Sequence, residues 1–262
     1  MAKTQIYLGS ILLEPNRWKA GKNPSFRLSE WIPRIREAGF DGIELWENHY
    51  LKADEREQAA LRAAAGYFTV FNTYAGFDTD EKMQKEREAA ASALRSLKSE
   101  AVKFNVGSKP ERLMDYLRVM KEWAGTFPSS LRLLCECHGG TVLETPEGAS
   151  TGFAEWTDTA RYQAIVHAFS IPPKILSEWM TRLRPHVTHV HAQLRDDKDR
   201  LLRLDRRPKE VKEALRILKD NGFAGSFTLE FTEGTRTADD RPDHLFANAL
   251  LDLAYLREQW TG

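Results

Sequence analysis

Segments typical of β-strands alternate with segments typical of α-helices along the whole chain, and this alternation limits the folds that it can form. Successive predicted strands begin roughly 25 to 40 residues apart, with a helical pattern or a polar loop between them. Repeated βαβ units predict a parallel sheet covered by helices. The eight predicted strands span residues 6–10, 42–46, 67–72, 102–106, 131–138, 163–168, 187–194 and 226–231.

Helices are predicted from apolar residues at helical spacing and from the residues that begin and end them. Thr79 is the expected N-cap of the third helix, and Ser108 is that of the fourth. Between residues 139 and 160, where Gly, Thr, Pro and Ser are frequent, we expect only a short helix. The other predicted helices span residues 28–39, 54–65, 79–97, 109–124, 172–183, 208–219 and 244–258.

Regular alternation without an interdomain linker favours an α/β fold, a single closed (β/α)8 TIM barrel over residues 1–262. An open doubly wound sheet is the alternative. Such sheets usually bind phosphates at a Gly-x-Gly-x-x-Gly or Gly-x-x-x-x-Gly-Lys-Ser/Thr turn after an early strand, and neither motif occurs here. We therefore expect the closed barrel.

Charge and composition limit the partners of the chain. The 38 basic and 38 acidic side chains cancel, which argues against a nucleic-acid or membrane partner and favours a small neutral or singly charged substrate. The N-terminus has no apolar signal region and no apolar run is long enough to span a membrane, so we expect a cytoplasmic protein. Cys135 and Cys137 are expected to be buried fillers of the core without a disulfide between them.

Ionisable side chains occur at the C-terminal ends of the last four predicted strands. In a (β/α)8 barrel these ends form the active face. Side chains alternate across a strand, so Glu136 and His138 share one side. On the fourth strand we expect at most one of Lys103 and Asn105 to face the lumen. The four residues expected to converge are Glu136, His167, His191 and Glu230.

Two carboxylates and two imidazoles form a ligand set for Mn²⁺, Co²⁺, Zn²⁺ or Fe²⁺. Any one of the four residues alone could be an ordinary hydrogen-bonded barrel residue. Four at successive strand ends favour a metal site, because a buried carboxylate without a partner is unfavourable. With two nitrogen ligands in the set, Mg²⁺ is less favoured.

Most of the chain shares motifs with a known family. The motifs are GFDGIELW at residues 39–46, ECH at 136–138, HVH at 189–191 and NGFAGSFTLE at 221–230. They resemble the xylose-isomerase-like barrels, a family of sugar isomerases and epimerases that also includes endonucleases acting at abasic sites. The resemblance implies the same barrel fold.

The resemblance also implies roles for particular residues. Glu136 and Glu230 would be metal ligands that exchange protons with the substrate, and His191 would be a third ligand. Family members usually have Asp at the end of strand six and His three residues later, where this chain has His167 and Ser170. We expect His167 to take the place of that Asp as the fourth ligand.

Four residues are candidates for substrate contacts. His138 could hold a substrate hydroxyl or pair with a ligand carboxylate. Trp46, which ends strand two near His49, could stack on a sugar or pack beneath the loops. Arg195 could bind a hydroxyl or a phosphate, or lie in a solvated turn.

The predicted activity is that of a metal-dependent sugar or keto-sugar isomerase or epimerase, in which one Glu removes a proton beside a carbonyl and another returns it to the enediolate. A lyase, such as a dehydratase or deglycosylase, could use the same site on an oxidised sugar. Two further alternatives are an abasic-site endonuclease, which would need a basic face, and a non-catalytic sugar-binding barrel. The expected partner is a small carbohydrate, and the oligomeric state stays open.

Overall fold

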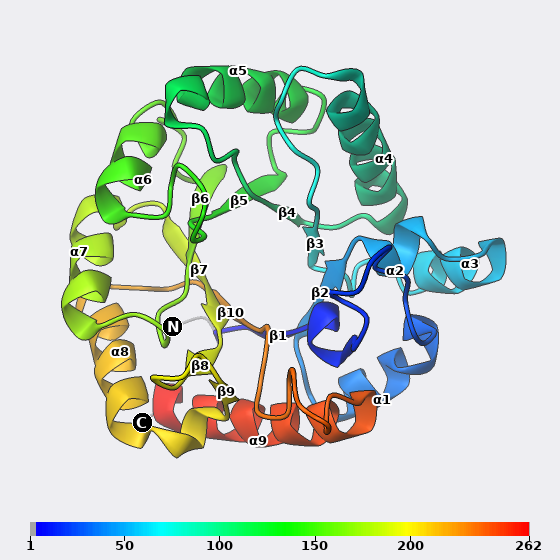
Figure 1. Ribbon diagram of the computed structural model, residues 1–262, viewed down its shortest axis with the longest axis vertical. Coiled ribbons are helices and arrows are strands. Elements are labelled where there is room, and N and C mark those ends of the chain that lie inside the picture. The colour runs from blue at the N-terminus through cyan, green and yellow to red at the C-terminus, as the bar shows by residue number, and fades with distance from the viewer. Residues whose placement is uncertain (1–3, 262) are drawn as a thin grey trace.

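Eight parallel strands form a closed barrel in the computed structural model, which describes residues 4–261 (Figure 1). Around the barrel they follow the order β1-β10-β7-β6-β5-β4-β3-β2, which confirms the predicted (β/α)8 architecture. The barrel strands are β1 (Ile6–Gly9), β2 (Gly42–Trp46), β3 (Val70–Asn72), β4 (Ala101–Phe104), β5 (Arg132–Glu136), β6 (Tyr162–Val166), β7 (Val187–Ala192) and β10 (Ser226–Leu229).

Helices surround the barrel because each buries an apolar face against the strands (Figure 1). On the fifth helix, Tyr116, Met120 and Trp123 recur at helical spacing and are buried. Among residues 4–261, no helix is both long and apolar enough to cross a membrane. The helices are α1 (Ile32–Glu37), α2 (Asn48–Leu51), α3 (Glu55–Ala63), α4 (Glu81–Leu97), α5 (Leu113–Ala124), α6 (Pro146–Phe153), α7 (Pro173–Leu183), α8 (Pro208–Asp220) and α9 (Pro242–Thr261).

Two helix starts differ from the prediction. Asp80, rather than Thr79, caps α4: its side chain accepts a hydrogen bond from the backbone N–H of Met83 at 3.0 Å. The predicted cap Ser108 is also wrong, because Lys109 occupies the N-cap position of the 3-10 turn that leads into α5. Both predictions chose a capping residue one position too early, and backbone conformation decides which residue is the last one outside the helix.

An antiparallel hairpin that the sequence does not predict follows β7. It consists of β8 (Leu194–Arg195) and β9 (Leu201–Leu202). Leu201 packs in a small apolar cluster with Ile11, Trp46 and Phe231, which lie at or beyond the ends of β1, β2 and β10. The hairpin therefore covers part of the barrel mouth.

The barrel interior has an apolar layer below a polar one. Inward-facing positions nearer the C-terminal strand ends carry the ionisable and hydrogen-bonding residues described below. At Gly9 of β1 a Cβ would lie 3.0 Å from the carbonyl oxygen of Leu229, so the backbones of β1 and β10 come close together there. Cys135 and Cys137 are buried and free. The apolar layer consists of Tyr7, Val70, Ala101, Leu134 and Ile165.

The two ends of the chain close the barrel. β1 pairs in parallel with β10, and Trp260 Nε1 at the end of α9 donates a hydrogen bond to Thr4 Oγ1 at 2.7 Å. Arg17, in the loop region after β1, is fully buried and forms an ion pair of 2.8 Å with Asp240, in the loop after β10. The loops on both sides of this seam are thereby fixed at the mouth.

Asp252 of α9 links the loop after β10 to the segment that follows the hairpin, and it should make stability depend on pH. Its carboxylate accepts hydrogen bonds from the backbone N–H of Leu204 at 2.7 Å and from Thr232 Oγ1 at 2.6 Å. Burial raises its pKa from 3.8 to about 7. Between these values the folded chain holds more protons than the unfolded chain, so the free energy of unfolding should fall by up to about 1.4 kcal/mol per pH unit as pH rises.

Asp252→Asn has no ionisable group, so this contribution to the pH dependence should disappear. Both contacts can be kept if Oδ1 accepts from the Leu204 N–H and Nδ2 donates to Thr232 Oγ1. Urea unfolding of both proteins at several pH values between about 4 and about 8 measures it. Parallel stability curves for the two proteins would show that Asp252 does not titrate in this range.

Candidate functional site

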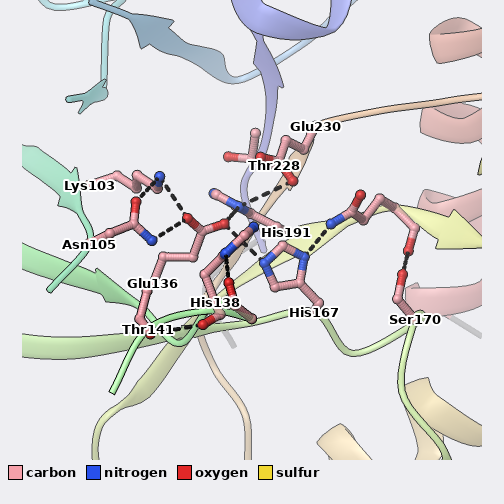
Figure 2. Close-up of polar contacts among 12 residues, drawn as sticks. Lys103, Asn105, Glu136, His138, Thr141, His167, Ser170, His191, Thr228 and Glu230 are labelled. Atoms are coloured by element: carbon pink, nitrogen blue, oxygen red, sulfur yellow. Dashed lines mark hydrogen bonds and ion pairs between the residues drawn. The ribbon is translucent and has the colours of Figure 1, made fainter. Parts of the chain in front are cut away.

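Four ionisable side chains from neighbouring strands meet at the barrel mouth (Figure 2). Glu136 ends β5, His167 follows β6, His191 lies on β7 and Glu230 follows β10. One carboxylate oxygen or ring nitrogen of each lies within 4.8 Å of those of the other three. Because bonds to divalent transition metals are about 2.0 to 2.3 Å long, one ion could reach all four.

His191 is at the centre of this cluster and is wholly buried. Its Nδ1 lies 3.1 Å from Glu136 Oε1 and 3.4 Å from Glu230 Oε2, and its Nε2 lies 3.1 Å from Glu44 Oε2. Burial alone would lower the pKa of the imidazole, but Glu44 and Glu230 raise it well above its usual range. The raised pKa favours a proton on Nδ1, which faces Glu136 and Glu230, and a divalent cation would compete with that proton.

Glu44 on β2 is a buried carboxylate that the sequence does not assign to the site. Besides contacting His191, it accepts hydrogen bonds from Thr228 Oγ1 at 2.9 Å and from Asn72 Nδ2 at 2.8 Å. Burial would raise its pKa, but His191 lowers it below its usual range. Because Glu44 contacts Nε2 of His191, Nδ1 is the ring nitrogen that faces the cluster. Many metal-binding histidines likewise contact a carboxylate through the nitrogen that does not bind the metal. The feature of the sequence that could have identified Glu44 was an acidic residue at an inward position of a predicted strand.

Lys103 and Asn105 both contact Glu136. Lys103 Nζ lies 2.6 Å from Glu136 Oε2, and Asn105 Nδ2 donates to the same oxygen at 2.8 Å (Figure 2). The expectation that at most one of them faces the lumen is wrong, because side chains two residues apart on an extended chain share a face.

This buried pair keeps both of its charges. Burial would lower the pKa of Lys103, but the carboxylate of Glu136 raises it above its usual range. Burial would likewise raise the pKa of Glu136, and Lys103, the largest opposing influence, holds it well below its usual range. Glu136 is therefore a carboxylate with an ammonium group on one of its oxygens.

Glu230 differs from Glu136 in its hydrogen bonding. Its Oε2 is buried and has no hydrogen-bond partner among the described residues. Nδ1 of His191 lies 3.4 Å from this oxygen but already contacts Glu136 at 3.1 Å, so a bound metal ion would be a better partner for it. Together with the second carboxylate and the imidazoles of the cluster, this oxygen fits a divalent metal that accepts mixed nitrogen and oxygen ligands.

An open pocket of about 510 Å³ adjoins the cluster, since His167 belongs to both. His138 and Arg195 line the same pocket, and His138 is exposed. Nδ1 of His138 donates a hydrogen bond to the carbonyl oxygen of Gly139 at 2.5 Å. His138 and Arg195 thus lie where one small molecule could reach them and the cluster together.

Trp46 and His49 lie outside this pocket, and both side chains are buried. Trp46 is fully buried and packs against Leu201 of the hairpin. His49 is 2% exposed, and its ring nitrogens lie 3.0 Å from Ser10 Oγ and 3.2 Å from Glu14 Oε2. The hairpin covers Trp46, and buried polar groups contact both ring nitrogens of His49.

Solved structures match this fold over nearly the whole chain, although no protein-family model and no curated protein matches the sequence. The 3-keto-D-glucoside 4-epimerase from E. coli is 19% identical, with a TM-score of 0.65 over 98% of this chain and 100% of its own. The probable 3-DHS dehydratase of petrobactin synthesis from Bacillus anthracis is 16% identical, with a TM-score of 0.67 over 95% of this chain and 98% of its own.

A third match is a xylose isomerase-like TIM barrel fused to a 4-hydroxyphenylpyruvate dioxygenase. It is 20% identical, with a TM-score of 0.67 over 99% of this chain and 43% of the fusion protein. The chain has the xylose isomerase-like barrel fold. The resemblance predicted from the four motifs is confirmed at this level. The cluster of Glu136, His167, His191 and Glu230 lies at the C-terminal ends of the barrel strands. In (β/α)8 enzymes the active site is found at these ends.

Proposed function

We propose that this chain is a metal-dependent isomerase or epimerase of a small sugar or keto-sugar. The observation that carries the proposal is the approach of two carboxylates, Glu136 and Glu230, to Nδ1 of His191 beside an open pocket. These three residues are the proposed ligands of Mn²⁺, Co²⁺, Zn²⁺ or Fe²⁺, and His167 lies within reach as a fourth. Such a cation would polarise a sugar carbonyl and its neighbouring hydroxyl.

The two carboxylates supply the proton transfers. Glu230, whose Oε2 accepts no hydrogen bond from residues 4–261, removes the proton next to the carbonyl. Glu136 is the second carboxylate. Because it is ionised, it returns a proton to the resulting enediolate only after taking one from solvent or from Lys103, whose Nζ lies 2.6 Å from its Oε2. The nearby ammonium of Lys103 stabilises the negative charge of that enediolate. His138 and Arg195 are the proposed contacts for substrate hydroxyls.

A lyase acting on an oxidised sugar is the second candidate. The same enediolate can expel a β-substituent instead of being reprotonated, and the buried ammonium of Lys103 would stabilise the charge on the departing group. The likeness in fold to a probable dehydratase is in keeping with this reading. The identity of the product separates the two activities.

Proton exchange with solvent tests the proposal before the natural substrate is known. Metal-loaded protein is incubated in D₂O with a panel of keto-sugars, beginning with 3-keto-D-glucosides because of the E. coli epimerase. We expect the ¹H NMR signal of the C–H beside the carbonyl to disappear only when protein and metal are both present. A new carbohydrate isomer would identify an isomerase or epimerase, and an eliminated group would identify a lyase. Binding without exchange for every ligand in the panel would contradict a catalytic role.

A further inference from the structure

Gln193 connects the hairpin to the proposed metal site. It follows β7 directly, two residues after His191, and is 6% exposed. Ser170 Oγ donates to its backbone carbonyl at 2.6 Å. Its side-chain amide lies between two other residues: Oε1 is 3.3 Å from Arg195 Nη2, and Nε2 contacts Nδ1 of His167.

Arg195 fixes the direction of the hydrogen bonds that run from it through Gln193 and His167 to Glu136. A guanidinium has only donors, so Gln193 turns its amide oxygen to Arg195 and its NH₂ group to His167. An NH₂ group can only donate, so Nδ1 of His167 carries no proton. The proton of a neutral imidazole is then on Nε2, and Nε2 lies 2.9 Å from Glu136 Oε1.

We propose that Arg195 and Gln193 are positioning residues that hold His167 as the Nε2–H tautomer, in which it donates a hydrogen bond to Glu136 and is not a metal ligand. A nitrogen binds a metal through its lone pair, and the protonated Nε2 offers none. The inference rests on the proposed metal site and replaces the expectation that His167 is the fourth ligand. The other three residues of the cluster remain as ligands, which is the usual number in catalytic sites that keep a position open for substrate.

A half-turn of the Gln193 amide would give the opposite result. Oε1 of Gln193 would accept a hydrogen bond from a protonated Nδ1 of His167, and Nε2 of His167 would be free to bind a metal. The amide NH₂ would then face the Arg195 guanidinium, so that two donors would meet. Arg195 is held in place by the hairpin turn, where its Nη1 donates to Asp199 Oδ1 at 2.7 Å. The hairpin therefore decides which arrangement His167 adopts.

The tautomer can be measured in metal-free protein without any turnover. In a long-range ¹H–¹⁵N spectrum of protein with ¹⁵N-labelled histidine, protonated and bare ring nitrogens resonate in separate ranges, and His167→Gln identifies the signals of His167. We expect a bare Nδ1 and a protonated Nε2. Gln193→Glu supplies a group that only accepts hydrogen bonds, so Nδ1 should become protonated. Arg236→Gln changes the charge of the same pocket by one unit and should leave the tautomer unchanged.

Metal affinity gives a second, independent readout. In the otherwise wild-type protein, His167→Gln should change the dissociation constant for Mn²⁺ by less than about twofold. In the Gln193→Glu background, where the proton on Nδ1 lets a metal displace the proton of Nε2, the same substitution should weaken binding by about 10-fold or more.

A protonated Nδ1 in the wild type, alone or together with a protonated Nε2, would overturn the proposal. A 10-fold loss of Mn²⁺ affinity from His167→Gln alone would overturn it as well. If no divalent metal binds to the wild type, the proposed function fails, and the NMR spectrum then decides the tautomer by itself.

Discussion

Glu230→Gln is expected to lower turnover by about 10²- to 10⁴-fold, the range for loss of a general base. The amide keeps the shape of the side chain but cannot take a proton. Oε2 of Glu230, buried without a hydrogen-bond partner in the described part of the chain, is the oxygen best placed to accept one. Exchange in D₂O gives the rate, and elemental analysis of the same sample gives the bound metal.

Two controls separate the loss of a base from the loss of a ligand. Glu233→Gln, three residues further along the same loop, changes a surface carboxylate paired with Arg206 and should leave turnover intact. Glu230→Asp keeps a carboxylate, so saturating metal should restore part of its activity if metal binding was the main loss. Near-normal turnover of Glu230→Gln with metal retained would remove Glu230 from the mechanism.

Lys103→Met should lower the free energy of unfolding of the metal-free protein by about 3 to 5 kcal/mol, the range for breaking a buried ion pair. Lys103 Nζ lies 2.6 Å from Glu136 Oε2, and both side chains are 3% exposed. Without the ammonium, Glu136 must be protonated or stay charged without its closest cation. Adding Glu136→Gln to Lys103→Met should recover most of the loss, because the carboxylate is then absent too.

The pH dependence of this loss has a definite sign. In the wild type the pKa of Glu136 lies well below its usual range, so its stabilising contribution is present at neutral pH and is lost as pH falls through the lower, folded value. Without Lys103, burial should raise that pKa, so that stability falls as pH rises. The difference between the two proteins should therefore be larger at about pH 7.5 than at about pH 5. Equal losses at both values, or no rescue by Glu136→Gln, would contradict the account.

The alternation of strands and helices was enough to predict the barrel, since each element carries its own local pattern. The same alternation placed Glu136, His191 and Glu230 on inward positions at strand ends, and these residues do lie together. Contacts between strands on opposite sides of the barrel could not be predicted from these local patterns. Glu44 and His191 are 147 residues apart, and only the register of the closed sheet brings them to 3.1 Å.

Short elements limited the prediction in another way. The hairpin has strands of two residues each, too short for an alternating pattern to reveal. It nevertheless buries Trp46 and places Arg195 beside the pocket. For this reason, exposure at the barrel mouth could not be judged from the position of a residue along its strand.

Closure of the barrel by its last strand also affects how the chain emerges during synthesis. β1 pairs with β2 on one side and with β10 on the other, and β10 begins only at Ser226. Until that segment leaves the ribosome, β1 has an unpaired edge, and such edges pair readily with other chains. A ribosome stalled before Ser226 would hold an aggregation-prone chain, and translation of the last strand removes that hazard.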